Sequence, residues 1–189
     1  MPSVEAKYGI SLVAALLLLG GCGGNLMGTL KISTDAFNPN GPIPSKHTGE
    51  GDDVSPALAF SGVPDGAKSL AIICDDPDAP RPEPWVHWII YNIPAGSESL
   101  PEGVPRDAEP ASPAGTRQGI NSWPAGNVGY RGPMPPPGHG VHHYHFRLYA
   151  LDTTLDVAPA KADKDTLLSA MKGHVLDEAE VVGTYERKR

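Results

Sequence analysis

The sequence predicts a mostly β fold in which short strands are joined by turns and one short helix lies near the C-terminus. Its 189 residues are enough for one domain with a substantial core. The chain holds 21 prolines and 22 glycines, a composition that is typical of many turns rather than of long helices. Apolar runs of strand length recur between these turns, whereas helical spacing of apolar residues is found near the C-terminus.

The first strands are expected in the N-terminal half of the chain. Residues 29–33 alternate in polarity, and residues 57–60 form a short apolar run that a turn sequence closes. Residues 69–74 form a continuous apolar run of strand length, which fits a strand buried on both faces, although periodicity alone does not distinguish it from a helix. Cys74 ends this run and is expected to be a buried thiol.

Residues 85–92 are rich in aromatic and β-branched side chains and predict a further strand. Strand alternation would place four of its side chains on one face: Trp85, His87, Ile89 and Tyr91. The segment from 96 to 140 is rich in proline and glycine, has almost no apolar periodicity, and is interpreted as an ordered, stiff loop.

The C-terminal third predicts two strands with a helix between them. Residues 141–152 alternate, so that one face would carry His142, Tyr144, Phe146, Leu148 and Ala150 toward the core. Asp163 or Asp165 is expected to cap a helix whose apolar stripe runs through Leu167, Leu168, Met171 and Val175. Residues 179–185 predict the last strand.

The N-terminus predicts export. An unbroken apolar run at residues 12–19 is too short to span a bilayer and is typical of a secretory signal, which we place at residues 1–21. The run ends in Leu-Gly-Gly-Cys22, which resembles the lipobox of bacterial lipoproteins, so Cys22 is the expected lipidation site. Residues 22–28 would then be a tether and residues 29–189 the domain, anchored to a membrane of the cell envelope. A signal peptide without lipidation, or a poorly ordered N-terminus, is the alternative.

The net charge of −7 argues against nucleic acid as a partner. A protein that binds nucleic acid needs a basic surface, and the only long basic run here is at residues 187–189. No nucleic-acid partner is therefore expected.

The stretch from 75 to 92 concentrates acids, prolines, tryptophans and one histidine between two apolar runs. Prolines stiffen a loop, and a stiff loop can hold polar groups in place. Taken without further information, Asp76 and Asp78 are residues of the kind that bond their own turn, and His87 is a core histidine. The functional interpretation is a rigid site that includes Asp76, Trp85 and His87.

Five separated motifs decide between these interpretations. They are Asp76-Pro77-Asp78-Ala79-Pro80, Trp85-x-His87-Trp88, Asn92-Ile93-Pro94, Gly129-Tyr130-x-Gly132-Pro133 and His142-x-Tyr144. Over residues 29–186 the chain resembles the phosphatidylethanolamine-binding protein family, and in particular its bacterial, Raf-kinase-inhibitor-like branch. The resemblance implies an antiparallel Greek-key β-sandwich with a short C-terminal helix and a small pocket for an anion such as phosphate. The pocket motif falls on Asp76, Trp85, His87, Gly132, Pro133, His142 and Tyr144.

The chemistry of this set suits a small anionic ligand. We expect N–H groups of His87 and His142, the Tyr144 hydroxyl and a backbone N–H at or near Gly132 to donate to the anion. Asp76 is expected to accept from a pocket histidine, or to bind the ammonium part of a zwitterionic ligand. Trp85 would wall the cavity, and Asp78 is expected to remain a turn residue.

The leading expectation is a non-enzymatic, exported, lipid-anchored protein that binds a small anionic or phosphorylated ligand and is regulatory or inhibitory toward a kinase or protease. One alternative is an envelope serine protease inhibitor that acts through a loop at residues 107–128. Another is a hydrolase that uses Ser122, His142 and Asp76. No cofactor is expected, and no metal site is predicted at the histidines of residues 139–145 because a complete ligand set is missing.

Overall fold

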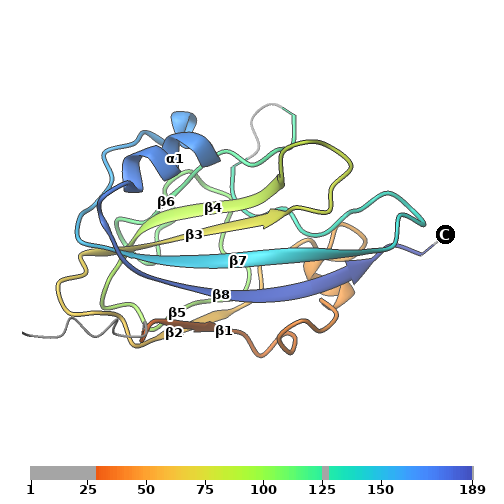
Figure 1. The fold of residues 1–189 in the computed structure, drawn as a ribbon, viewed down its shortest axis with the longest axis horizontal. Coiled ribbons are helices and arrows are strands. Elements are labelled where there is room, and N and C mark those ends of the chain that lie inside the picture. The colour runs from red at the N-terminus through yellow and green to blue at the C-terminus, as the bar shows by residue number, and fades with distance from the viewer. Residues whose placement is uncertain (1–28, 125–127, 189) are drawn as a thin grey trace, which may run out of the picture.

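The protein is built as two β layers and a helix that covers the outer face of the larger layer (Figure 1). The computed structural model describes residues 29–124 and 128–188. A five-stranded sheet has the order β6-β4-β3-β7-β8, and a three-stranded sheet has the order β1-β2-β5. All pairings between these strands are antiparallel. The expected mostly β, antiparallel fold with one short α-helix is thus confirmed.

The strands agree with most of the expected segments and extend several of them. The larger sheet contains β3 (Ser69–Asp76), β4 (Trp85–Pro94), β6 (Arg117–Gln118), β7 (Val141–Leu151) and β8 (Val175–Glu186). The smaller sheet contains β1 (Lys31–Ser33), β2 (Leu58–Ser61) and β5 (Ser99–Leu100). Two short 3-10 helices, at Ser45–His47 and Pro159–Lys161, lie in the connections.

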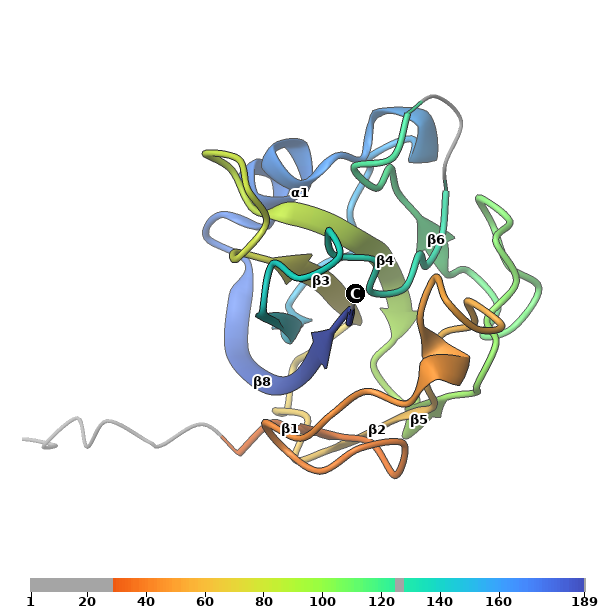
Figure 2. The ribbon, with the colours of Figure 1, turned by 90° about the vertical axis from the view of Figure 1, so that its right-hand side faces the viewer.

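The main core lies between the two sheets, which Figure 2 shows nearly end-on. On β7 the inward residues are those expected from alternation, since His142, Tyr144, Phe146, Leu148 and Ala150 are all buried. Tyr144 lies opposite Gly183 of β8. A side chain at Gly183 would come within 2.6 Å of Ile43, so a glycine is needed where β8 crosses the loop that contains Ile43.

A second apolar cluster lies between the larger sheet and α1 (Lys164–Met171). Because β3 sits between both clusters, every one of its residues is buried. The run at residues 69–74 is therefore a strand buried on both faces. Cys74 is a buried free thiol, as expected.

A β-bulge at His87 changes the faces of β4. Along β3 the partners step from Cys74 to Asp75, whereas along β4 they step from Trp88 to Val86. His87 is therefore the extra residue of the bulge, and a bulge breaks the strict alternation of faces. As a result Ile89 and Tyr91 pack under the helix, in the second cluster, and the expectation that they share a face with Trp85 and His87 is wrong.

The helix starts directly after Asp163, one of the two residues predicted to cap it. The Asp163 carboxylate accepts a hydrogen bond from the backbone N–H of Thr166 at 2.8 Å, which is an N-cap contact. The helix ends at Met171, and Gly173 follows with a φ of +83°. Val175 begins β8 instead of extending the helical stripe, which corrects the predicted helix. Positive φ at a glycine is a usual way to end a helix.

The long segment between β4 and β7 is tied to the core by one buried amide. The Gln118 side chain accepts from Trp88 Nε1 at 2.7 Å and donates to the carbonyls of Pro105 and Asp107, each at 2.7 Å. These bonds hold this part of the expected loop against the larger sheet, and the short strands β5 and β6 also lie within residues 96–140.

The predicted signal segment, its lipobox and Cys22 lie outside the described residues. In residues 29–124 and 128–188, no helix has the length and apolar character needed to cross a membrane.

Candidate functional site

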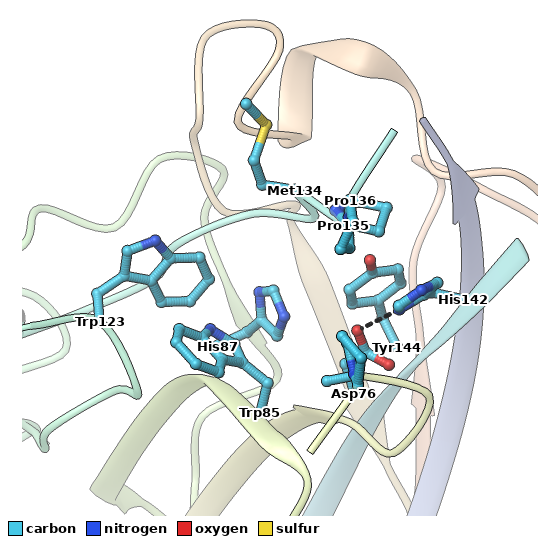
Figure 3. A pocket seen from close by; sticks show the side chains of 11 residues that line it. Asp76, Trp85, His87, Trp123, Met134, Pro135, Pro136, His142 and Tyr144 are labelled. Atoms are coloured by element: carbon cyan, nitrogen blue, oxygen red, sulfur yellow. Dashed lines mark hydrogen bonds and ion pairs between the residues drawn. The ribbon is translucent and has the colours of Figure 1, made fainter. Parts of the chain in front are cut away.

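A cavity of about 260 Å³ opens where one end of the larger sheet meets two loops (Figure 3). Its lining consists of Asp76, Ala79, Pro80, Trp85, His87, Trp123, Met134, Pro135, Pro136, His142 and Tyr144. Five of the seven predicted site residues are in this lining, and Gly132 and Pro133 are not. Lysine and arginine are absent from the residues that form the described lining.

Strand pairing brings the five residues together. Asp76 is the last residue of β3 and lies opposite Trp85, the first residue of β4. The bulge then directs His87 toward the same side of the sheet. β7 pairs with the other edge of β3 and brings in His142 and Tyr144.

Asp76 holds His142 in place. His142 Nδ1 donates to the Asp76 carboxylate at 2.7 Å, and both side chains are buried. The other carboxylate oxygen of Asp76 accepts from the backbone N–H of Asp78 at 2.8 Å, which closes a tight turn. Asp76 thus makes the contact with a pocket histidine that its sequence context suggested.

The second nitrogen of His142 is also engaged. This nitrogen, Nε2, lies 2.7 Å from Nδ1 of His139, an exposed residue in the loop just before β7. In a neutral His142 ring this nitrogen accepts from His139, and in a protonated ring it donates. Either arrangement leaves no free N–H on His142, so its expected role as a donor to an anion requires both a protonated ring and displacement of His139.

His87 presents an acceptor to the pocket. Its Nδ1 lies 2.6 Å from the Arg131 carbonyl oxygen, which can only accept, so the ring hydrogen is on Nδ1. Burial lowers the pKa of His87 to about 4, although the nearby carbonyl of Arg131 and the charge of Asp76 act in the opposite direction. The ring is therefore neutral near pH 7, and Nε2 carries a lone pair where the sequence suggested an N–H.

Tyr144 has a buried hydroxyl without a hydrogen-bond partner among the described residues. Burial and the charge of nearby Asp76 raise the pKa of Tyr144 well above its ordinary value, so the hydroxyl keeps its hydrogen. Figure 3 shows this hydroxyl at the end of the ring nearest to Pro135 and Pro136. A buried donor with no partner is costly to leave unsatisfied, and a ligand with an acceptor oxygen would satisfy it.

Two tryptophans form one wall of the cavity. The rings of Trp85 and Trp123 meet edge to face with 5.3 Å between centroids, and Trp123 packs on His87 in the same way at 4.9 Å. Arg81 lies 5.2 Å from the Trp85 ring and Arg131 lies 5.2 Å from the Trp123 ring. The two guanidinium groups thus hold the wall in place without belonging to the lining.

Gly132 and Pro133 support the loop that forms the opposite wall. The Gly132 N–H donates to the Asp53 carboxylate at 2.7 Å, and the Pro133 carbonyl accepts from Gly49 at 2.9 Å. The Gly132 N–H is thus used within the protein, in place of the expected contact with an anion. Asp53 also pairs with Arg131, which fixes the loop on both sides of Gly132.

Asp78 differs from its expected role as a turn residue. Its carboxylate accepts from the backbone N–H of His143 at 2.9 Å and from His143 Nδ1 at 2.7 Å. Partial burial raises the pKa of Asp78, but the hydrogen bonds from His143 outweigh this effect and the net shift is downward. Asp78 therefore fastens the proline-rich loop to the start of β7.

The residues named for a hydrolase are not assembled into a catalytic triad. The Ser122 hydroxyl oxygen accepts from the backbone N–H of Val86 at 2.8 Å and lies in the lining of a different cavity. His142 instead contacts Asp76 and His139. Within the described part of the chain, no group of three or more His, Cys, Asp or Glu residues is arranged to hold a metal ion.

Sequence reasoning missed several apolar lining residues and one polar contact. Trp123, Met134, Pro135 and Pro136 come from the long loop, where strand or helix periodicity gives no guide to orientation. The proline run directly after the Gly132-Pro133 motif was the available signal for this wall. The contact of His139 with His142 depends on how the chain turns into β7, and spacing alone does not reveal it.

The chain is similar to known proteins in sequence and in fold. Residues 33–186 match a family model described as phosphatidylethanolamine-binding protein. A UPF0098 protein of Methanothermobacter thermautotrophicus is 54% identical over 158 residues, which cover 84% of this chain and 99% of the relative. A UPF0098 protein of Pyrococcus horikoshii is 50% identical over 179 residues, which cover 93% and 87%.

Two crystal structures are similar in fold and in sequence. A phosphatidylethanolamine-binding protein homologue from Chlamydia trachomatis has a TM-score of 0.74 and 38% identity, covering 86% of this chain and 100% of its own. E. coli YbcL, described as a new member of the mammalian family, has a TM-score of 0.78 and 32% identity, covering 85% and 99%.

Proposed function

The chain belongs to the phosphatidylethanolamine-binding protein family, and from this premise we propose that it is a non-enzymatic binding protein whose pocket holds a small anion such as phosphate or a phosphorylated head group. The ligand would sit between Tyr144, His87 and the two tryptophans, beside the Asp76 and His142 pair. Family membership supports a binding role in general, and the residues of this pocket support the ligand class.

The observation that carries the proposal is the unpartnered Tyr144 hydroxyl. A buried hydroxyl without a partner is destabilising by about 1–3 kcal/mol, so a protein retains one where a ligand can pair with it. Hydrogen bonds from neutral donors to ionised oxygens are also stronger than those between neutral groups. A phosphate oxygen at this position would therefore form a stronger hydrogen bond with the Tyr144 hydroxyl than a neutral acceptor would.

The walls of the pocket strengthen that contact. The apolar faces of Trp85, Trp123, Pro135 and Pro136 exclude water, and an electrostatic interaction is stronger where water is excluded. Asp76 is directed toward His142, and this pairing reduces its repulsion of an anion.

Titration calorimetry with inorganic phosphate and with phosphoethanolamine tests the pocket. We expect both to bind to a soluble protein that begins at residue 23, with dissociation constants in the millimolar range or tighter. Trp85→Ala removes one wall and should weaken binding, whereas Leu168→Ala removes an exposed apolar side chain of α1 outside the lining and serves as the control. An absence of heat with both ligands would refute the pocket proposal.

The proposed role is binding without turnover, because Ser122 does not contact the His142 and Asp76 pair. Ester and peptide substrates should therefore remain intact in the presence of the protein. A hydrolysis that Ser122→Ala abolishes would contradict this proposal and restore the hydrolase alternative.

We propose further that the protein is exported and anchored through Cys22 to a membrane of the cell envelope. The apolar run followed by Leu-Gly-Gly-Cys22 supports this location. In cells that express the full chain, wild type should fractionate with membranes and Cys22→Ser should appear in the soluble fraction. Membrane association that persists in Cys22→Ser would refute lipidation.

A regulatory or inhibitory action on a kinase or protease rests on analogy with the family alone. For the protease alternative, the loop at residues 107–128 is the segment to test. Inhibition of an envelope serine protease that is lost when residues 110–114 are replaced by Gly-Ser linker, while phosphate binding is kept, would support this alternative.

A further inference from the structure

The polar groups of the pocket are poorly matched to a fully ionised phosphate. The lining has no lysine or arginine in the described residues, and Asp76 places a carboxylate in it. His87 offers a lone pair on Nε2, because its hydrogen is on Nδ1 and is bound by the Arg131 carbonyl. The Tyr144 hydroxyl is free to donate. The site therefore combines a donor and an acceptor, and a suitable ligand needs both as well.

We propose that the pocket takes phosphomonoesters and inorganic phosphate in the form that keeps one P–OH group, in preference to phosphodiesters. In this form the P–OH donates to His87 Nε2, while an ionised oxygen of the same phosphate accepts from the Tyr144 hydroxyl. The inference rests on the proposed function, since it specifies the ligand of the same site.

The competing ligands leave one group of the site unsatisfied. A dianion would place an ionised oxygen against the lone pair of His87 Nε2, and two acceptors that face each other without a hydrogen repel. A phosphodiester has no P–OH, so it also leaves Nε2 without a hydrogen-bond partner. A site that is built to hydrogen-bond a hydroxyl group rejects analogues without it more strongly than an apolar site does.

The proton in this contact has a defined source. A monoanionic ligand brings it, whereas a dianion acquires it from solvent on binding. In the complex the proton lies between His87 Nε2 and one phosphate oxygen, so binding of a dianion takes up one proton.

The charges around His87 are arranged so that the proton is held only when the ligand is present. Asp76 of β3 lies beside the ring, and Asp75 acts on it from the helix side of the sheet. Tyr144 of β7 packs on the ring at 5.0 Å, and the backbone carbonyl of Arg131 accepts from Nδ1. Asp75 is itself paired with Arg147 and Lys164. Arg147 and Lys164 neutralise Asp75, and Asp76 is paired with His142. Burial is therefore the largest influence on the pKa of His87, and the His87 ring is neutral when the site is empty.

Calorimetry with a matched pair of ligands tests the inference in the wild-type protein. Phosphoethanolamine is the monoester and glycerophosphoethanolamine is the diester, which also represents the head group of a phospholipid. Near pH 6.5 we expect the monoester to bind at least about tenfold more tightly. Since the second pKa of a phosphomonoester is about 6, its affinity should fall about tenfold per pH unit between pH 7 and pH 8.5. Parallel titrations in buffers of different ionisation enthalpy should then report uptake of about one proton.

Two variants separate the proton contact from general binding. His87→Gln replaces the acceptor nitrogen with an amide that also donates, so the pH dependence should flatten and the preference for the monoester should shrink. Tyr144→Phe should weaken monoester binding by a similar factor at every pH. Circular dichroism establishes that each variant is folded, and the wild-type comparison decides the question if His87→Gln does not fold.

The outcomes distinguish this inference from the function on which it rests. Equal affinities for monoester and diester, or a monoester affinity that does not change between pH 7 and pH 8.5, would overturn the inference and leave the phosphate pocket in place. If no phosphate compound binds, the proposed function fails and the inference fails with it.

Discussion

At the scale of single residues, the hydrogen positions on the pocket side chains determine what can bind. Tyr144 can donate, His87 Nε2 can accept, and both nitrogens of His142 are already engaged. Residue types alone suggested three donors, since neutral imidazole offers one N–H. The Arg131 carbonyl and the Asp76 carboxylate each take one of these N–H groups within the protein, so the pocket has fewer donors than its composition implies.

Tyr144→Phe should weaken phosphate binding and leave the fold intact. A hydrogen bond to an ionised oxygen contributes about 1.5–3 kcal/mol, so affinity should fall about tenfold or more. Because the hydroxyl has no partner in the described protein, its removal should leave the free energy of unfolding unchanged or slightly increase it. Calorimetry and urea unfolding measure the two effects separately. A loss of stability without a loss of affinity would contradict the assignment of Tyr144 to the ligand.

At the scale of elements, a bulge and two tethered loops form the pocket. The bulge at His87 places this ring on the same side of the sheet as Trp88 and lets Val86 pack under the helix. The loop after residue 128 is held to the rest of the molecule by Asp53, which binds both Gly132 and Arg131. The pocket therefore depends on contacts between segments that are far apart in the sequence.

Gly132→Ala should destabilise the protein because the site has no room for a side chain. A Cβ atom there would lie 2.2 Å from the His47 carbonyl oxygen, which belongs to backbone and cannot rotate away. We expect a loss of about 1–3 kcal/mol in the free energy of unfolding. Gly96→Ala is the matched control, since its Cβ would meet no atom within 4 Å, and it should be neutral or slightly stabilising. Equal unfolding midpoints for the two variants would contradict this account.

Asp163→Ala should lower stability by about 1 kcal/mol through loss of the helix N-cap. Asp165→Ala removes an acid from the same first turn without removing the cap, so its effect should be limited to a few tenths of a kcal/mol. Urea unfolding of both variants measures the difference. If Asp165→Ala costs as much as Asp163→Ala, the capping contact is not what stabilises the start of α1.

At the scale of the whole molecule, folding stability depends on keeping His87 neutral. The side chain is buried between the sheet and the loop, and burial lowers its pKa from 6.5 to about 4. The unfolded chain therefore binds a proton at pH values where the folded protein does not. Stability from this group is complete above pH 6.5 and is lost as the pH falls toward 4.

The expected size of this effect is about 3 kcal/mol between pH 6.5 and pH 4, from about 1.4 kcal/mol for each pKa unit. Urea midpoints measured across this range should fall for wild type and should change less for His87→Gln. His143→Gln is the matched control, because that ring is half-exposed and lies outside the pocket. If the two variants follow the same curve as wild type, His87 is not the group that titrates.

By itself the sequence determined the class of fold and most of the strands, because hydrophobic periodicity and turn residues act locally. It also indicated Asp76, Trp85, His87, His142 and Tyr144, since they lie in motifs that the family shares. Only the tertiary structure decided which nitrogen of His87 carries the hydrogen, which partner takes the Gly132 N–H, and which loop residues form the second wall. The His87 and Gly132 contacts join residues that are 44 and 79 positions apart, and local pattern holds no information about how such segments meet.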